Sequence, residues 1–271
     1  ITRTPNRIHW YTGQIWVKRK GFSRVFYKFI DKLIFFLSHK VLIDSFSQKK
    51  FLIKKKILSI KNSIVIHKGS VGGVDTAKFK FNYQKRVKLR RDFSISSKTF
   101  VFLYLGRINK DKGIIELIKA FKKIRKNNDV LLIFVGPIED EDLTYLIKGK
   151  NKILYFNFTT SPQDWYSLAD TLCIPSHREG FGTVVIEAAS CGIPALCSNI
   201  YGLYDSITEH ETGFLHEAGS INDIKKKMSY IIKNKKLVKN YGMLARKRVL
   251  KDFEQNLVTK KLIKFINSNI G

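Results

Sequence analysis

The 271-residue sequence is most constrained by a regular alternation of short apolar runs and amphipathic stretches that begins near residue 98. Phe100–Leu105 and Val130–Val135 are continuous apolar runs, which is the pattern of strands buried on both faces. Residues 113–127 lie between them and carry apolar side chains at helical spacing. Further apolar runs follow at Ile153–Phe156, Thr171–Ile174 and residues 194–197. The alternation predicts an α/β domain with a parallel, right-handed, doubly wound sheet.

The first 85 residues are less regular. Residues 21–38 have helical spacing, residues 41–43 and 64–66 are predicted strands, and the serines within 45–47 are candidates to cap the following helix. Two strands and two helices are too few to close an α/β domain, which usually exceeds about 100 residues. We therefore interpret this segment as the latter part of an N-terminal domain whose beginning precedes the chain.

The charge of the chain is strongly positive and uneven. Its 50 Lys and Arg residues against 22 Asp and Glu give +28, and residues 1–100 hold 24 basic and 4 acidic groups. Such a field favours an anionic partner, namely nucleic acid, an anionic membrane surface or a phosphorylated ligand. The alternative is a surface that is lysine-rich by composition alone. Cys173, Cys191 and Cys197 lie in apolar or small-residue contexts, which indicates reduced structural cysteines.

The end of the first buried strand carries a basic loop, residues 106–113 (GRINKDKG). Ligands of doubly wound sheets bind beyond the carboxyl ends of the strands. Gly106 permits a tight turn over a ligand, and Arg107 and Lys112 bring two cations to the same place. An Arg fork and a Lys point charge suit a diphosphate. A solvated basic loop without a ligand is the alternative.

The fourth apolar run is followed by the most informative stretch, residues 175–189 (PSHREGFGTVVIEAA). Gly180 and Gly182 permit a loop whose N–H groups, with the next helix, favour a phosphate or ring hydroxyls. Glu179 lies in this loop, whereas Glu187 lies inside an apolar helix. Burying such a carboxylate is costly unless it accepts hydrogen bonds, for instance from sugar hydroxyls. Capping of a neighbouring backbone segment is the other interpretation of Glu187.

Both stretches, together with residues 211–215 (ETGFL), resemble the retaining glycosyltransferases of family 4. These enzymes have the GT-B fold, in which two Rossmann-like domains face each other across a cleft. The resemblance runs from about Arg7 to the C-terminus. Residues 12–16 (TGQIW), 31–34 (DKLI) and 69–75 (GSVGGVD) are similar to the subgroup that extends lipid-diphosphate-linked sugars in surface glycan assembly.

The resemblance implies an α/β fold of GT-B type with one complete Rossmann-like domain and part of another. Residues 1–85 would be a partial acceptor-side domain, and residues 95–250 the domain that binds the nucleotide-sugar donor. Residues 251–271 would form a helix that packs back on the N-terminal part. The glycine-rich loop expected near the start of the first domain lies before the chain. Many relatives carry a His before the glycine of the loop at Gly13, where this sequence has Thr12.

The resemblance also implies roles for residues. Arg107 and Lys112 would neutralise the donor diphosphate and stabilise the departing nucleotide, and Glu179 would contact the donor hexose. The backbone of residues 181–183 would hold the sugar and the β-phosphate, and Glu187 would accept the ribose hydroxyls. The base would lie near Gly136, Pro137 and residues 156–158, largely against backbone. The expected catalytic residues are thus Arg107, Lys112 and Glu179, and the expected substrate-binding residues are Gly106, Gly136, Phe181, Gly182, Thr183 and Glu187.

The expected reaction is transfer of a hexosyl or N-acetylhexosaminyl group from a nucleotide sugar, UDP-linked, to a lipid-linked or glycan acceptor. The family implies retention, by front-side attack assisted by the leaving diphosphate, in cell-surface polysaccharide or glycan biosynthesis. No cofactor and no metal are expected, because Arg107 and Lys112 supply the positive charge. The expected partners are the donor, the acceptor and an anionic membrane, without nucleic acid. The expected location is the cytoplasm, peripheral at the inner face of the membrane.

Three alternatives to this metal-independent transferase stay open. Asp140, Glu141 and Asp142 form an acidic triplet of the kind that binds a divalent metal in other transferases, although acids also open helices. Basic clusters at residues 54–56 and 85–91 suggest a nucleic-acid-binding protein, but no zinc spacing or recognition motif accompanies them. An inactive fragment that still binds a nucleotide sugar is the third.

The helix predicted over residues 21–38 has two interpretations. Its apolar face of Phe22, Phe26, Phe29, Leu33 and Leu37 is accompanied by several lysines and arginines. A basic amphipathic helix can lie on an anionic bilayer, where each cation near the surface contributes about 1 kcal/mol. The same stripe is equally typical of a helix that packs on the core of an α/β layer.

Overall fold

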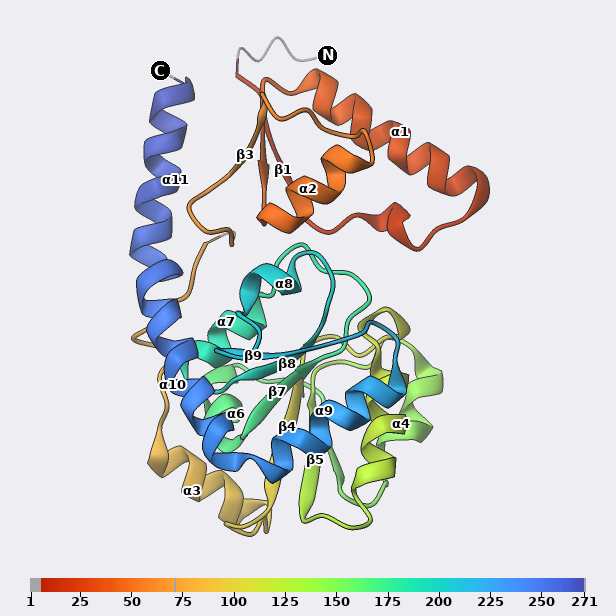
Figure 1. The fold of residues 1–271 in the computed structure, drawn as a ribbon, viewed down its shortest axis with the longest axis vertical. Coiled ribbons are helices and arrows are strands. Elements are labelled where there is room, and N and C mark those ends of the chain that lie inside the picture. Colours follow the sequence, from red (N-terminus) through yellow and green to blue (C-terminus); the bar gives the residue numbers. More distant parts are fainter. Residues whose placement is uncertain (1–5, 71, 271) are drawn as a thin grey trace.

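The computed structural model describes residues 6–70 and 72–270 (Figure 1). Within these residues there are two parallel sheets, one of three strands in the order β1-β2-β3 and one of six in the order β6-β5-β4-β7-β8-β9. Figure 1 shows the small sheet with its helices above the large one, and the C-terminal helix beside the small sheet. The parallel, doubly wound α/β arrangement predicted for the second part is confirmed.

The small sheet is built from the irregular N-terminal segment. Its strands are β1 (Ile8–Tyr11), β2 (Lys40–Ile43) and β3 (Ser63–Val65), with α1 (Gly21–Leu37) and α2 (Phe46–Lys54) as the crossovers. The short helix η1 (Ile15–Val17) places Trp16 in a small core with Tyr11 and Leu52. The Ser45 hydroxyl caps α2 by accepting a hydrogen bond from Gln48 N at 3.2 Å, as predicted. Strand β1 was not predicted, because its sequence IHWY shows no clear apolar run.

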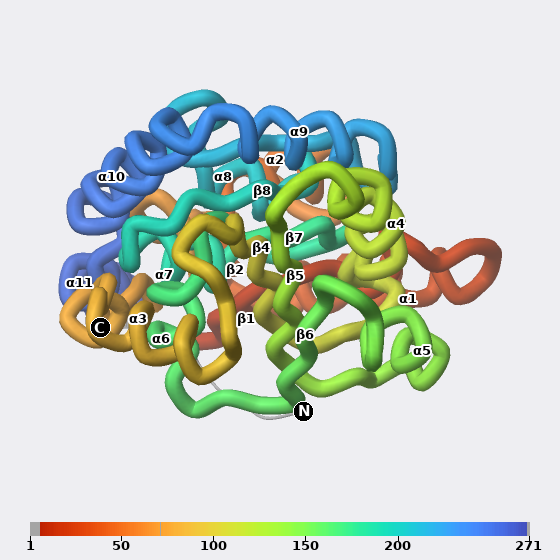
Figure 2. Tube along the Cα trace, turned by 90° about the horizontal axis from the view of Figure 1, so that it is seen from below, coloured from red at the N-terminus to blue at the C-terminus, as the bar shows by residue number. Residues whose placement is uncertain are grey.

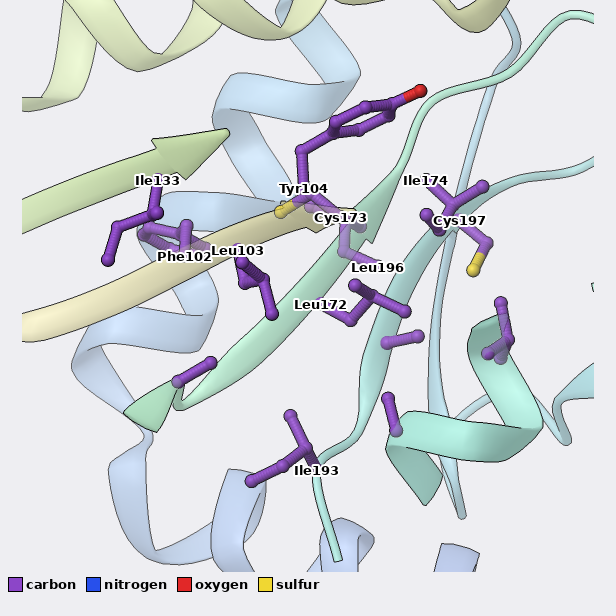
Figure 3. Packing of buried hydrophobic residues seen from close by; sticks show 14 of the residues in the cluster. Phe102, Leu103, Tyr104, Ile133, Leu172, Cys173, Ile174, Ile193, Leu196 and Cys197 are labelled. Atoms are coloured by element: carbon purple, nitrogen blue, oxygen red, sulfur yellow. The ribbon is translucent and has the colours of Figure 1, made fainter. Parts of the chain in front are cut away.

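The large sheet follows the predicted alternation closely. Its strands are β4 (Phe100–Leu105), β5 (Val130–Val135), β6 (Ile153–Phe156), β7 (Thr171–Ile174), β8 (Ala195–Ser198) and β9 (Gly213–His216). Figure 3 shows side chains of β4, β7 and β8 packed together, with Leu103, Leu172 and Leu196 at the centre. The three cysteines are free and buried, in agreement with the structural role predicted for them. Strand β9 was not predicted.

Helices cover both faces of the large sheet. On one face α4 (Ile114–Ile124) packs against α9 (Ile221–Lys233), and on the other α6 (Pro162–Leu168) contacts α3 (Tyr83–Asp92) and α7 (Thr183–Ser190). Figure 2 shows α9 and α6 on opposite sides of the strands. The remaining elements are η2 (Lys110–Lys112), η3 (Glu141–Leu143), α5 (Thr144–Ile147), α8 (Leu203–Ser206) and α10 (Lys235–Asp252).

The chain returns to the first domain beside residue 74. Val74 N donates to Phe253 O at 2.8 Å, and Gln255 N donates to Val74 O at 3.0 Å. Gly73 has φ +67°, and a Cβ there would lie 2.6 Å from Phe253 O, so glycine is required at this crossing. From here α11 (Gln255–Ile270) runs beside the first sheet in Figure 1.

The predicted apolar face of α1 does not pack on the core. No residue of this helix is buried, and Phe22 and Phe36 are 84% and 83% exposed. The contacts with the small core come instead from Tyr27, Ile34 and Phe35, which lie on another face. Within the described residues, the Phe22 stripe is therefore left uncovered. Among the described residues, no helix combines the length and the apolar character needed to cross a bilayer.

An ion-pair network with a buried arginine lies at the start of the central strands β4 and β7 of the large sheet. Asp170 accepts hydrogen bonds from Arg86 at 2.6 Å and Arg90 at 2.9 Å, and also from Val101 N at 2.7 Å. Arg90 is only 6% exposed. Arg90 therefore links α3 to the start of β4, and its guanidinium is almost completely shielded from solvent.

We predict that Asp170→Ala lowers the free energy of unfolding by about 3 kcal/mol, because it leaves the Arg90 guanidinium buried without its partner. Urea denaturation followed by circular dichroism measures this. Asp92→Ala is the matched control, since the Arg91–Asp92 pair on α3 is exposed and should change stability by less than about 0.5 kcal/mol. Equal effects of the two substitutions would contradict the prediction.

Candidate active site

A cavity of about 320 Å³ lies between the two domains, at the carboxyl ends of strands from both sheets. The first domain contributes residues that follow β1 and β2, and the second contributes residues that follow β4 and β7. Its lining residues are Thr12, Gly13, Asp44, Arg107, Asn109, Asp111, Lys112, Arg178, Glu179, Gly180 and Phe181. Arg107, Lys112, Glu179 and Phe181 were expected from the sequence to form a site. The structure brings these four together.

Lys112 and Glu179 form the central ion pair of the cavity. Lys112 Nζ lies 2.6 Å from Glu179 Oε1, and both side chains are about one-fifth exposed. The turn that carries Lys112 ends at Gly113, whose φ is +67° and whose Cβ would lie 2.0 Å from Pro175 O. Only glycine permits this approach of the two loops. The β4 and β7 loops are thereby fixed against each other, with a cation and a carboxylate facing the same space.

Arg107 lies at the mouth of the cavity. Its Nη1 is 3.1 Å from Glu139 Oε1, and its side chain is mostly exposed. The Asn109 amide donates to the other oxygen of Glu139 at 2.6 Å. This bond, together with the Arg107 guanidinium, holds the pKa of Glu139 below its ordinary value. Because the pair is exposed, the guanidinium can turn toward an anion in the cavity at little cost.

The Glu179 loop touches the first domain backbone to backbone. A Cβ on Gly180 would lie 2.5 Å from Asp44 Oδ2, 2.9 Å from Gly13 N and 3.1 Å from the Thr12 carbonyl carbon. No side chain fits there without moving one domain. Gly180 thus matters for close packing between domains, in addition to the loop conformation expected from the sequence.

Further contacts hold the domains together around the cavity. Ser47 N donates to Asp205 Oδ2 at 2.9 Å, and Gly202 N donates to the Ser47 hydroxyl at 2.9 Å. Ser47 therefore binds the second domain, and the interpretation of this residue as a helix cap is wrong. Lys18 reaches Asp111 at 3.0 Å, and Asp111 also accepts from Arg178 at 3.0 Å. In this structure the two domains are therefore closed on each other around the cavity.

The other expected substrate-binding residues lie outside the cavity lining: Gly106, Gly136, Gly182, Thr183 and Glu187. Gly106 and Gly136 pack on each other, since a Cβ on Gly136 would lie 2.0 Å from Gly106 O. Thr183 is the first residue of α7. Glu187 Oε2 accepts a hydrogen bond from the buried Tyr166 hydroxyl at 2.8 Å, and burial raises the pKa of this carboxyl. Their roles toward a substrate stay predictions.

The acidic triplet is engaged with a lysine. Lys110 N donates to Asp140 Oδ2 at 2.7 Å, and Lys110 Nζ lies 2.6 Å from Asp142 Oδ2. Nowhere in the described parts of the chain do three His, Cys, Asp or Glu side chains gather as a metal site requires. His177 Nε2 points to Glu116 at 3.2 Å and is not among the residues of the cavity.

Asp44 was missed by the sequence motifs. Among the lining residues it is the charged one that comes from the first domain, and it directly follows β2. Its one sequence signal is an acid at the carboxyl end of a buried strand, the same rule that located the loops of the large sheet. The first 85 residues show no regular alternation, so the ends of their strands do not stand out in the sequence.

Comparisons with known proteins agree with this architecture. The family described as Glycosyl transferases group 1 matches residues 85–248. The capsular polysaccharide biosynthesis glycosyltransferase CapM of Staphylococcus aureus is 30% identical over 275 residues, which cover 99% of this chain and 72% of CapM. The N-acetylgalactosamine-N,N'-diacetylbacillosaminyl-diphospho-undecaprenol 4-alpha-N-acetylgalactosaminyltransferase of Campylobacter jejuni is 22% identical, over 94% of this chain and 67% of its own length.

Solved structures show the same fold. Anabaena Alr3699/HepE in complex with UDP has a TM-score of 0.82 at 18% identity, covering 96% of this chain and 72% of that one. Sucrose-phosphate synthase from Thermosynechococcus elongatus also has a TM-score of 0.82, at 20% identity, covering 96% and 67%. Two parallel α/β layers with a cavity between them thus define a glycosyltransferase fold of GT-B type, and the expected fold class is confirmed. The chain belongs to the group 1 glycosyl transferases.

We predict that Gly180→Ala loosens the closed arrangement while each domain stays folded, because the added methyl meets backbone atoms of the first domain. Hydrogen exchange measured by mass spectrometry should be faster in peptides that cover residues 12–14 and 44–48. Gly72→Ala is the control, since nothing lies within 4 Å of a Cβ there. Unchanged exchange in Gly180→Ala would contradict the expected obstruction.

Proposed function

We propose that this chain carries the active site of a retaining glycosyltransferase that moves a hexosyl or N-acetylhexosaminyl group from a nucleotide sugar, without a metal. The observation that carries the proposal is the cavity between the domains, in which Lys112, Glu179 and Arg107 meet. Cations at the end of β4 suit a diphosphate, and a carboxylate beside them suits sugar hydroxyls. UDP is the favoured nucleotide, because the structurally similar HepE was solved with UDP.

The acceptor is proposed to be a lipid-linked sugar or a growing glycan of the cell surface. CapM is named for capsular polysaccharide biosynthesis, and the Campylobacter relative is named for a sugar on diphospho-undecaprenol. The chain covers 72% of CapM and 67% of the Campylobacter relative, so their whole activity is carried over as a proposal.

The proposed mechanism depends on stabilising the negative charge that develops on the leaving diphosphate. As the bond from C1 of the sugar to the diphosphate oxygen breaks, its electron pair leaves with the diphosphate. Arg107 and Lys112 stabilise the charge that grows there, and Glu179 holds Lys112 in position for this task. The acceptor oxygen then bonds to C1 on the face that the diphosphate leaves, which retains the configuration.

The nucleic-acid alternative is disfavoured by the environment of the basic residues on α3. Arg86 donates to the carbonyls of residues 167–169 and to Asp170, and Arg90 is buried against the same carboxylate. These guanidinium groups are not available to phosphates of a duplex. A cavity with charged groups from both domains also argues against an inactive fragment.

Membrane attachment is proposed through α1. Its exposed apolar side chains include Phe22, Val25, Phe26, Phe29, Leu33, Phe36 and Leu37. Arg24 and Lys32 lie on the same helix, and Arg19 and Lys20 precede it. An apolar face bordered by cations suits an anionic bilayer, which is where a lipid-diphosphate acceptor would be presented. Attachment at the inner face of the cytoplasmic membrane is part of this proposal.

We predict that Arg107→Ala and Lys112→Ala each lower kcat by roughly 10²–10³, the range for losing a preorganised group that stabilises transition-state charge. Transfer from UDP-glucose or UDP-N-acetylglucosamine to a lipid-diphosphate-linked sugar measures this. Lys110→Ala is the control, since Lys110 is an exposed lysine of the same loop outside the cavity lining. Near-normal turnover in both variants together with EDTA-sensitive activity would favour the metal-dependent alternative.

We predict that the protein sediments with vesicles containing anionic lipid at low salt and is released at high salt. The double substitution Phe22→Ser and Phe36→Ser should lower the partition coefficient about tenfold per residue or more, because each buried phenylalanine contributes about 1.5–3 kcal/mol. Tyr145→Ser is the control, an exposed aromatic residue of the second domain. Equal binding to neutral and anionic vesicles, or none to either, would contradict the electrostatic part.

A further inference from the structure

A second hollow, of about 590 Å³, lies at the amino ends of three central strands of the large sheet. Residues 97–100, 169–170 and 191–194, which begin or precede β4, β7 and β8, line it together with α10 and the start of α3. We call this hollow the basal groove. Figure 1 shows α3 at the end of the large domain that is farthest from the small sheet. The basal groove is therefore built by the large domain, away from the cavity between the two domains.

The basal groove has an apolar base and an aromatic edge. Phe100 is buried at its base, whereas Phe81 and Tyr83 are exposed at its edge. The backbone between these two aromatic residues is fixed on the large domain, because Asn82 N donates to Ser167 Oγ at 3.0 Å. Aromatic side chains on a fixed backbone offer an apolar surface on which another ring can stack.

The charged groups of the basal groove are almost all cations. Its one acid among the lining residues, Asp170, is already paired with Arg86 and Arg90. Four other cations line the groove and form no ion pair within the described residues: Lys98, Lys235, Lys239 and Arg246. The field in the groove is therefore positive, and an anion is attracted to it.

The cations on α10 share one face of the helix. Lys235, Lys239 and Arg246 are four and seven residues apart, a spacing that brings side chains to the same side. Lys235 Nζ donates to Lys98 O at 3.4 Å and lies 5.9 Å from the centre of the Phe100 ring. Arg246 Nη1 donates to the carbonyl that ends α7. A carbonyl occupies one N–H and leaves the charge uncompensated, so the remaining donors of both groups can bind an anion.

The size and position of the basal groove favour a small soluble ligand. Its volume is within the range of sites that hold small organic molecules. A bilayer that α1 touches is at the other end of the molecule from α3 (Figure 1), so a membrane lipid is not within reach of the groove. Aromatic and apolar surfaces beside unpaired cations match a ligand that combines an aromatic body with an anionic group.

We infer that the basal groove is a second ligand-binding site, and that its ligand is a small organic anion with an aromatic body. The anionic group binds the cations on α10, and the aromatic body lies on the apolar base beside Phe81. No residue lines both this groove and the cavity between the domains. The inference therefore stands or falls separately from the proposed function.

The first test uses 8-anilinonaphthalene-1-sulfonate, which has an aromatic body and one sulfonate, in a fluorescence titration of the whole chain. Its Kd should be about tenfold lower than that of the uncharged N-phenyl-1-naphthylamine. The double substitution Lys235→Gln and Lys239→Gln should raise the Kd of the sulfonate about tenfold and leave that of the uncharged probe unchanged, because it removes contacts to a charged group. Both lysines are exposed, so the fold is kept, which circular dichroism checks.

The matched control is Lys236→Gln with Lys247→Gln, which removes the same charge from exposed positions of α10 outside the groove lining. This pair should leave the Kd of the sulfonate unchanged. Equal affinity for the charged and uncharged probes, no binding of the sulfonate, or the same effect of the two lysine pairs would overturn the inference.

The second test locates the probe. Phe81→Ser should weaken binding of the sulfonate severalfold, because it removes an aromatic side chain from the edge of the groove. Lys112→Ala in the cavity, and Phe22→Ser with Phe36→Ser on α1, should leave the Kd unchanged. Loss of binding in either of these variants, with no effect of Phe81→Ser, would place the probe in the cavity or on α1 and would overturn the inference.

Discussion

The structure depends on one close contact, the approach of the Gly180 loop to the first domain. At this point the backbone of one domain lies against the backbone and the Asp44 carboxylate of the other, with room for a hydrogen atom only. The contact brings the carboxyl ends of two parallel sheets together, so groups nearly 170 residues apart in the sequence share one cavity. Ser47, Asp205 and the Lys18–Asp111 pair hold the same arrangement from the sides.

The basic residues have different roles in different parts of the structure. Arg86 and Arg90 are held inside the fold by carbonyls and Asp170, so they serve stability. Arg107 and Lys112 line the cavity, where Lys112 is paired with Glu179 and Arg107 with Glu139. The basic residues around α1 accompany an apolar face that the rest of the chain leaves uncovered. A net charge of +28 therefore does not indicate one anionic partner.

Much of the large domain was predictable because its strands are buried on both faces. Continuous apolar runs located β4, β5, β6 and β7 with the correct ends, and the strand-end rule located Lys112 and Glu179. Strand β1 was not predicted because it is short and its sequence is polar and aromatic. Its one buried residue, Tyr11, belongs to the small core that η1 and α1 complete. Strand β9 begins with Gly213, a residue that weakens any strand pattern.

The sequence by itself determined the parallel α/β architecture, the loops with Arg107, Lys112 and Glu179, and the resemblance to glycosyltransferases of the GT-B fold. These features are local, because the spacing of apolar residues, the turn residues and the motifs each lie within a short segment of the sequence. Only the tertiary structure decided which face of α1 is covered, because an apolar stripe fits a core and a bilayer equally well. It also decided that Asp44 faces Gly180, because that neighbourhood arises from contact between two domains, which no pattern along one segment encodes.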